Sequence, residues 1–346
     1  MGKPSVKNVM VTGGAGFIGS CFVEQLVQEG HRVVVFDALT YAGHRANLAA
    51  VESKIEFVEG DIRDLAAVRS VLAERSIDWI VNFAAESHVD RSIENAADFV
   101  HTNVVGVFTL LGAALEHFEK LPANKKSEFR FIQVSTDEVF GSLGETGHFT
   151  EETPYAPNSP YSASKAGGDH LARAWFHTYR LPVIITNCSN NYGPRQYPEK
   201  LIPHMIQCAL AEKPLPVYGD GRNVRDWIHV SDHSRGIYLA ALKGVPGESY
   251  CFGGRSERRN IDVVRGICRE LDGLKPRARG SYEELISFVI DRKGHDWRYA
   301  IDDVKAERDL GFKREYGEFE TGLKQTVRWY LENDAWVQAV MKESAR

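Results

Sequence analysis

Two hydroxyl and two acidic side chains follow one another in the sequence, at Ser135, Thr136, Asp137 and Glu138. They come directly after an apolar run over residues 131–134, which is typical of a buried strand. Because the carboxyl ends of strands in an open parallel sheet line the crevice where ligands bind, we expect this cluster to face a ligand. Alternatively, the first three residues would only cap the helix or turn that follows.

A tyrosine and a lysine four residues apart, Tyr161 and Lys165, share one face of a predicted helix. A phenol ionises near pH ~10, and an ammonium group beside it favours the phenolate and lowers its pKa. The two could therefore form an acid/base pair, although on their own such a pair is more often found at the surface. The loop over residues 141–160, rich in Gly, Pro, Thr and Glu, leads into this helix and is typical of a lid or a binding segment.

A glycine-rich turn near the N-terminus indicates a dinucleotide site. Gly14, Gly16 and Gly19 have the G-x-G-x-x-G spacing, and Gly13 gives a wider G-x-x-G-x-x-G match. The turn lies between a predicted strand and a predicted helix, where backbone amides and the helix N-terminus can approach a pyrophosphate. The second strand ends in Asp37, whose carboxylate can accept both ribose hydroxyls of NAD and would repel the 2′-phosphate of NADP.

Two further strand ends carry small or polar residues. Asp61 follows the third predicted strand, where it would reach the adenine edge or cap the helix that begins near Leu65. Ala84 and Ala85 follow the fourth strand and would let a cofactor lie close to the backbone. The polar run over residues 86–91 after them suits a sugar or a phosphate.

The alternation of strands and helices predicts an α/β fold, a Rossmann-type doubly wound parallel sheet with a smaller mixed α/β C-terminal domain. We expect residues 1–186 to form an NAD-binding domain that includes the catalytic residues. Residues 187–346 would form mainly a substrate domain, partly interleaved with the first. A long helix is predicted over 96–118. A last helix is predicted over 318–341, with a structural role in covering the core.

Composition narrows the class of protein. Hydrophobic residues make up 43% of the 346 residues and charged residues 26%, which is ordinary for a globular protein and excludes disordered, collagen-like and coiled-coil chains. The net charge of −5 argues against a nucleic-acid partner. Without a run of 18 apolar residues or a signal peptide, neither a membrane partner nor export is expected. The five cysteines lack C-x-x-C spacing, so we expect no metal site, no disulfide framework and a cytoplasmic location.

Several motifs carry a resemblance to a known family. The motifs TGGAGFIGS, AAESHVDRS and YSASK, with the strand end at Thr136, resemble the extended short-chain dehydrogenase/reductases that act on nucleotide sugars. Within that group, STDEVFG, DALTYAG, NCSNNYGP, PEKLIP, NVRDW and GHDWRYAID are similar to the dTDP-glucose 4,6-dehydratase family. The resemblance runs from residue 9 to about 336. Phe140 and Lys293 depart from it, where tyrosine and proline are frequent.

The resemblance implies two sets of binding residues. The NAD site would consist of Gly13, Gly16, Phe17, Ile18, Gly19, Asp37, Leu39, Thr40, Asp61, Ile62, Ala84, Ala85, Ser87, Thr102, Tyr161, Lys165 and Asn191. The nucleotide-sugar site would consist of Ser87, His88, Thr136, Asp137, Glu138, Asn190, Lys200, Leu201, Pro216, Tyr218, Arg225, Asn260, Arg292 and His295. In the second set Tyr218 would hold the base and Arg225 the diphosphate.

The implied activity is that of a hydro-lyase acting on dTDP-glucose, in deoxysugar biosynthesis such as that of dTDP-rhamnose. Tyr161, held by Lys165 and Thr136, would remove the 4-hydroxyl proton while hydride passes from C4 to NAD. Glu138 would then take the C5 proton while Asp137 protonates the departing 6-hydroxyl, after which hydride returns to C6. These roles need one protonated and one ionised carboxyl group. Two neighbouring acids in a dry site favour that arrangement, because like charges push their proton affinities apart.

Three alternatives stay open at this point. A UDP- or CDP-sugar 4,6-dehydratase would share all the proposed catalytic groups. A nucleotide-sugar 4-epimerase would use Tyr161 but would have no task for Asp137 and Glu138. A non-catalytic NAD-binding protein would need only the fold. The resemblance also implies a homodimer formed by the helices that start near Ala96 and Ser159.

Overall fold

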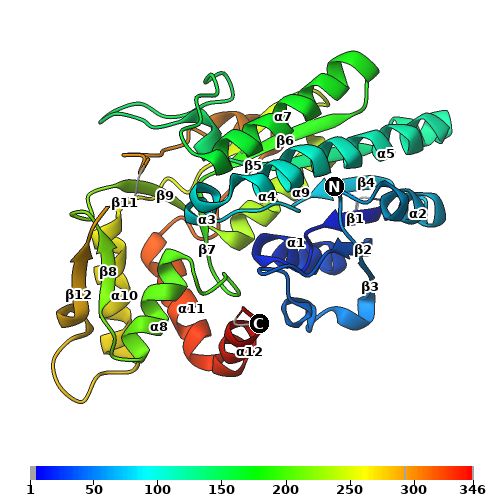
Figure 1. Cartoon of the computed structure of the whole chain (residues 1–346). Helices are drawn as coiled ribbons and strands as arrows, with labels where there is room; N and C mark the ends of the chain where they lie inside the picture. The colour runs from blue at the N-terminus through cyan, green and yellow to red at the C-terminus, as the bar shows by residue number, and fades with distance from the viewer. Residues whose placement is uncertain (1–4, 292–293, 345–346) are drawn as a thin grey trace.

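The computed structural model describes residues 5–291 and 294–344. Its centre is a seven-stranded parallel sheet with the order β10-β6-β5-β4-β1-β2-β3 (Figure 1). This arrangement confirms the predicted Rossmann-type fold class. The strands are β1 (Asn8–Thr12), β2 (Arg32–Asp37), β3 (Ile55–Glu59), β4 (Trp79–Asn82), β5 (Arg130–Thr136), β6 (Val183–Cys188) and β10 (Ser249–Phe252).

Helices cover both faces of this sheet because successive side chains in each strand point to opposite sides. In β1, Val9 and Val11 pack in one core cluster with α1 and α9, whereas Met10 packs in another with α2, α5 and α7. All three side chains are fully buried. These helices are α1 (Phe17–Gln28), α2 (Leu65–Arg75), α5 (Val107–Lys120), α7 (Pro160–Tyr179) and α9 (Val230–Lys243).

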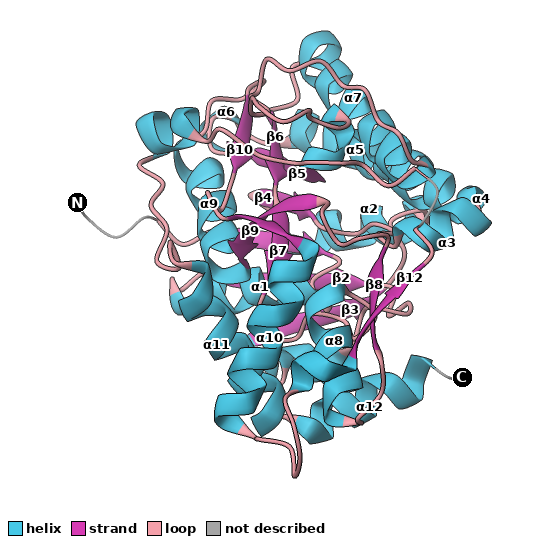
Figure 2. Ribbon diagram, turned by 90° about the vertical axis from the view of Figure 1, so that its left-hand side faces the viewer, coloured by secondary structure: helices cyan, strands magenta, loops and turns pink. Residues whose placement is uncertain are grey.

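A second part of the molecule lies beside the carboxyl ends of the main sheet (Figures 1 and 2). It has its own apolar core, which includes Tyr192, Ile206, Val264 and Leu323. Its strands form the sheets β11-β9-β7 and β12-β8. The elements are β7 (Asn190–Tyr192), β8 (Leu215–Tyr218), β9 (Val224–His229), β11 (Glu257–Arg259), β12 (Ile286–Val289), α8 (Leu201–Leu210), α10 (Asn260–Leu274), α11 (Phe319–Glu332) and α12 (Asp334–Ser344). Since α9 and β10 return to the main sheet between them, the two parts interleave.

Two predicted elements need correction. The last helix is not continuous: α11 ends at Glu332 and α12 begins at Asp334, with Asn333 between them in a non-helical conformation. The fifth strand extends through Thr136 and is followed at once by a short 3-10 helix, Asp137–Phe140. The polar residues at the strand end are therefore held by regular structure on both sides.

The predicted long helix after the fourth strand is present but is locally irregular. It consists of α4 (Ala96–Val100), a π-helical segment (His101–Gly106) and α5, and a separate short helix, α3 (Val89–Glu94), precedes it. The stretch Ala96–Lys120 is long and apolar enough to cross a membrane by length and composition, contrary to the prediction from the sequence. In the fold, 44% of an 18-residue apolar segment within this stretch is buried. The stretch is therefore a partly buried helix that flanks the sheet.

Candidate active site

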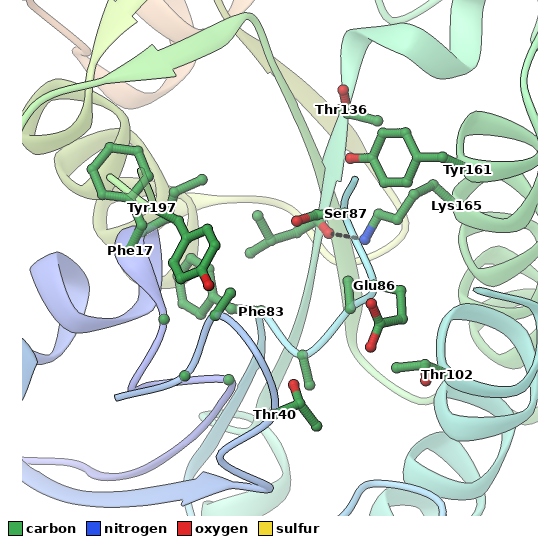
Figure 3. A pocket seen from close by; sticks show the side chains of 18 of the residues that line it. Phe17, Thr40, Phe83, Glu86, Ser87, Thr102, Thr136, Tyr161, Lys165 and Tyr197 are labelled. Carbon is green, nitrogen blue, oxygen red and sulfur yellow. Dashed lines mark hydrogen bonds between the residues drawn. The ribbon is translucent and has the colours of Figure 1, made fainter. Parts of the chain in front are cut away.

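A cavity of about 430 Å³ lies at the carboxyl ends of the central strands, between the two parts of the molecule. Figure 3 shows Phe17 and Tyr197 on one side of it, Tyr161 and Lys165 on the other, and Thr40 at the bottom of the view. Most of the residues expected to bind NAD line its walls: Gly13, Gly16, Phe17, Ile18, Asp37, Thr40, Asp61, Ile62, Ala84, Ala85, Ser87, Thr102, Tyr161, Lys165 and Asn191. Gly19 and Leu39 are next to these residues but outside the walls.

The glycine turn packs so closely that side chains would not fit at two of its positions. Gly13 has a φ of +66°, and a Cβ there would lie 2.6 Å from the backbone nitrogen of Ala84. A Cβ on Gly19 would lie 2.2 Å from the carbonyl oxygen of Gly13. Helix α1 follows with Gly16 as its N-cap and no side-chain cap, so its first amides point into the turn with their partial positive charge.

Asp37 fixes the glycine turn to the end of β2. Its Oδ2 accepts a hydrogen bond from the Ala15 amide and its Oδ1 one from the Leu39 amide, both at 2.8 Å. Burial raises the pKa of Asp37, while the two amides lower it. Each carboxylate oxygen keeps a second lone pair for a ligand hydroxyl.

Asp61 pairs with a neighbouring arginine and does not cap the helix that follows it. Its carboxylate forms a two-pronged contact with the guanidinium of Arg63, with distances of 2.6 to 3.0 Å. The N-cap of α2 is Asp64, whose side chain accepts from the amides of Ala66 and Ala67. The alternative that Asp61 caps this helix is therefore wrong, because the helix begins one turn too late for it.

Tyr161, Lys165 and Thr136 meet where β5 ends beside the first turns of α7 (Figure 3). Lys165 is buried, and its Nζ donates to the carbonyl oxygen of Val134 at 2.8 Å. Burial and the nearby Glu138 raise the pKa of Tyr161 well above 10, whereas a hydrogen bond with Thr136 lowers it. The net direction is opposite to the lowering expected from Lys165, because desolvation of the phenolate is the largest effect.

The two acids line the same cavity but differ in exposure. Asp137 is 1% exposed, and burial, followed by the charges of Glu138 and Asp226, raises its pKa well above the usual range. Its Oδ1 accepts from the Thr136 hydroxyl at 3.3 Å, and its Oδ2 is buried without a hydrogen-bond partner. Glu138 is partly exposed at the cavity wall. The site thus holds one buried carboxyl group whose protonated form is favoured beside a second, more accessible carboxyl group.

The residues expected to bind a nucleotide sugar fall into two groups. The cavity brings together Ser87, Thr136, Asp137, Glu138, Asn190 and Lys200, the last donating from Nζ to the Ser87 carbonyl oxygen at 2.8 Å. Outside its walls are His88, Leu201, Pro216, Tyr218, Arg225, Asn260 and His295. Arg292 is outside the described residues.

Most of the second group lies in the C-terminal part around β8 and β9. Tyr218 is 43% exposed, and its ring lies 6.3 Å from that of His295, which contacts Asp291 at 2.7 Å. Arg225 is buried, and its guanidinium donates to the Asp296 carbonyl oxygen at 2.9 Å and lies 4.2 Å from the Tyr299 ring centre.

Sequence reasoning missed one polar residue that lines the cavity and one that supports its wall. Asn103, in the π-helical segment, is buried and exchanges two hydrogen bonds with the backbone of Glu86 while donating to Ser164 at 2.9 Å. An amide within an apolar helix was the available signal. Glu199 lines the cavity 3.6 Å from His88, and burial raises its pKa; no motif distinguished it from the neighbouring Lys200.

Among the described residues, no group of three or more His, Cys, Asp or Glu side chains could hold a metal ion. All five cysteines are free thiols.

The chain was compared with known proteins. The model of the GDP-mannose 4,6 dehydratase family matches residues 10–326. The dTDP-glucose 4,6-dehydratase of Xanthomonas campestris pv. campestris (strain B100) is 57% identical over 340 residues, which cover 97% of each chain. Two solved dTDP-glucose 4,6-dehydratases with NAD bound have the same fold. The Streptomyces venezuelae structure has a TM-score of 0.87 and 48% identity over 96% of this chain and 99% of that one. The Bacillus anthracis structure has a TM-score of 0.85 and 46% identity over 97% of this chain and 100% of that one.

These similarities extend over almost the whole chain and include both parts of the molecule. They confirm the family expected from the sequence motifs. The chain belongs to the GDP-mannose 4,6-dehydratase family and, within it, to the dTDP-glucose 4,6-dehydratases.

Proposed function

We propose that this protein is an NAD-dependent hydro-lyase that converts dTDP-glucose to dTDP-4-keto-6-deoxyglucose and water. One observation carries the proposal: Asp137 and Glu138 line the same cavity as Tyr161 and Lys165. A 4-epimerase would need the tyrosine and a cofactor but would have no task for two acids. The choice of dTDP-glucose over other sugar nucleotides follows the names of the relatives.

The residues present fit NAD. The close-packed glycine turn, the uncapped start of α1 and the Asp37 carboxylate would hold the pyrophosphate and the ribose hydroxyls. Thr40 and the backbone around Ala84 would complete the wall. When bound, NAD supplies hydride-accepting and hydride-donating chemistry at the sugar.

The side chains of the cavity divide the proton transfers among them. Tyr161 takes the proton of the 4-hydroxyl, with Thr136 as its hydrogen-bond partner. The 4-ketone acidifies C5, and Glu138 removes the C5 proton and later returns it to that carbon. Asp137 is the acid that protonates the departing 6-hydroxyl, since burial raises its pKa and so favours the protonated form.

The substrate is expected to extend from the cavity toward β8. Ser87, Asn190 and Lys200 would contact the sugar from the cavity wall. Tyr218 and His295, near β8, would hold the base. Pro216, Arg225 and Asn260 would complete the nucleotide pocket. Residues 1–186 thus mainly bind NAD and carry the catalytic groups, and residues 187–346 mainly bind substrate.

Incubation with dTDP-, UDP- and CDP-glucose, followed by analysis of the sugar product, tests this function. We expect a 4-keto-6-deoxy sugar, formed fastest from dTDP-glucose. A galactose product would favour the epimerase alternative. Absence of turnover with all three substrates would favour a non-catalytic NAD-binding protein.

A homodimer in the cytoplasm is the expected working form. Val100, Val105, Phe108 and Tyr179 are large apolar side chains that are 45 to 53% exposed on α4, the π-helical segment, α5 and α7. Phe108 and Trp175 join α5 to α7 edge to face at 5.8 Å, so these residues belong to one surface. A second copy, rather than a membrane, would cover it, which sedimentation of the purified protein would test; a monomer at micromolar concentration would contradict it.

A further inference from the structure

A buried acid on α7 has no task in the chemistry proposed above. Asp169 is 1% exposed and follows Lys165 by four residues and Tyr161 by eight. Residues at this spacing lie on one helical face, so Asp169 continues into the interior the row formed by the two proposed acid/base residues. An ionisable group in that position needs a reason, because burying a carboxylate without compensation is costly.

Lys165 and Asp169 are each attached to the end of β5, at consecutive residues. Lys165 Nζ donates to the carbonyl oxygen of Val134 at 2.8 Å. The hydroxyl of the next residue, Ser135, donates to Asp169 Oδ2 at 2.5 Å. The same strand end therefore fixes both side chains, and it does so immediately before Thr136.

Two further elements complete this buried network. The hydroxyl of Tyr155, from the loop over residues 141–159, donates to Asp169 Oδ2 at 3.2 Å. Asn187, in β6, donates from Nδ2 to the Thr136 carbonyl oxygen at 3.0 Å and to the Tyr155 hydroxyl at 3.4 Å. Asp169 is thus the acceptor at which the helix, the strand end and the loop meet.

The charges around the pair favour an interaction between Lys165 and Asp169. The other titratable groups nearby are Tyr155 from the loop, which donates to Asp169, Cys188 in β6, which lies near Lys165, and Cys251 in β10, which lies near Tyr155. Burial raises the pKa of all three, so they are neutral at physiological pH. A buried ammonium group needs a nearby anion to stay charged, and Asp169 is the acid that supplies it from the same helix.

We propose that Asp169 is a positioning residue whose carboxylate keeps the Lys165 amine protonated and held against the end of β5, where it serves Tyr161. The inference rests on the proposed function only for the role of Tyr161. The pairing of Lys165 with Asp169 rests on their helical spacing and on their attachment to consecutive residues of β5.

The direction of the pKa changes agrees with this role. Burial lowers the pKa of Lys165, and Asp169 raises it again. Burial also raises the pKa of Asp169 to about 6, against the lowering effects of Lys165 and the Ser135 and Tyr155 hydrogen bonds. Asp169 is therefore ionised at neutral pH and loses its charge as the pH falls through about 6.

The pairing can be tested without any turnover. Competitive labelling of lysine amines with acetic anhydride across a pH series, read by mass spectrometry, gives the pH at which the Lys165 amine loses its proton. In Asp169→Asn, which keeps the shape and removes the charge, we expect this midpoint to move to lower pH by on the order of one pH unit. The matched control is Asp309→Asn, an exposed Asp on the surface, which should leave the midpoint unchanged.

The outcomes separate a positioning role from a packing role and from failure of the proposed function. An unchanged Lys165 midpoint in folded Asp169→Asn protein would overturn the inference, even if its melting temperature fell. Failure of the wild-type protein to turn over dTDP-glucose would instead contradict the proposed function and leave the labelling result valid.

A second variant covers the case in which Asp169→Asn does not fold. Ser135→Ala removes a hydrogen bond to the charged form of Asp169, which should raise the pKa of that carboxyl group. In the pH–rate profile of cofactor reduction by dTDP-glucose, the fall in rate on the acid side (the acid limb) should then occur at higher pH than in the wild type. An acid limb at the wild-type position would overturn the inference.

Discussion

The indole N–H of Trp336 donates to Asn47 Oδ1 at 2.9 Å, which joins the last helix of the chain to the cofactor turn. Asn47 in turn donates from Nδ2 to the carbonyl oxygen of Ala15 at 2.7 Å. The Ala15 amide is the one that Asp37 fixes. A short chain of hydrogen bonds therefore connects α12, in the C-terminal part, with the turn expected to hold the pyrophosphate.

Trp336→Phe should weaken retention of NAD, because it keeps an aromatic ring and removes the N–H that orients Asn47. A lost hydrogen bond of this kind is worth about 1 kcal/mol, or on the order of a fivefold weaker binding constant. Titration of the cofactor-free protein with NAD by calorimetry measures it. Trp329→Phe is the matched control, since Trp329 packs against Trp336 at 5.0 Å on the same side of the molecule. Equal affinities in the Trp336 variant and the wild type would show that this link does not support the turn.

Asp137→Asn should separate the oxidation step from the loss of water. Asparagine cannot protonate the departing 6-hydroxyl, while Tyr161 and Lys165 are unchanged. Stopped-flow absorbance should show cofactor reduction at a rate close to that of the wild type, followed by elimination that is about 10²-fold slower or more. Elimination at the wild-type rate would show that another group is the acid.

The same substitution should stabilise the fold at neutral and alkaline pH. Because the pKa of Asp137 is raised in the folded state, the folded protein keeps a proton that the unfolded chain releases above about pH 4. Stability is therefore lost as the pH rises from that point toward the folded-state pKa. Asparagine removes this loss.

Calorimetric melting at about pH 4 and about pH 8 would test this linkage. We expect Asp137→Asn and wild type to melt alike at the acid pH and the variant to be more stable at the alkaline pH, by on the order of 1 kcal/mol. A difference that is the same at both pH values would mean that the ionisation of Asp137 does not limit stability.

The fold was largely predictable because it depends on local patterns. Strands such as β1 and β2 are nearly continuous apolar runs, and the glycines at 13, 16 and 19 mark the turn between β1 and α1. The break at Asn333 was not predictable, since the apolar spacing continues through it.

The candidate site was predictable where one segment supplies its residues. Asp137 and Glu138 are adjacent in sequence, and a helical spacing relates Tyr161 to Lys165. Contacts between distant segments left no such signal. Asn103 and the link from Trp336 to Asn47 depend on long-range packing, so only the structure reveals them.

Gly19→Ala should disrupt the cofactor site although Gly19 is not in the cavity wall. A Cβ would lie 2.2 Å from the Gly13 carbonyl oxygen, so α1 or the turn must move. We expect a loss of NAD affinity together with destabilisation of about 1 to 3 kcal/mol, measured by NAD titration and by urea unfolding. Gly273→Ala, in α10, meets nothing within 4 Å and should be neutral or slightly stabilising. Normal NAD binding by Gly19→Ala would contradict the importance of this close packing.

The most direct measurement follows deuterium placed at C4 of dTDP-glucose through one conversion. Hydride that leaves C4 and returns within the same closed site should carry the label to C6 of the 4-keto-6-deoxy product, which NMR would detect. Deuterium found at C4 of a galactose product, or lost to cofactor free in solution, would contradict the dehydratase assignment.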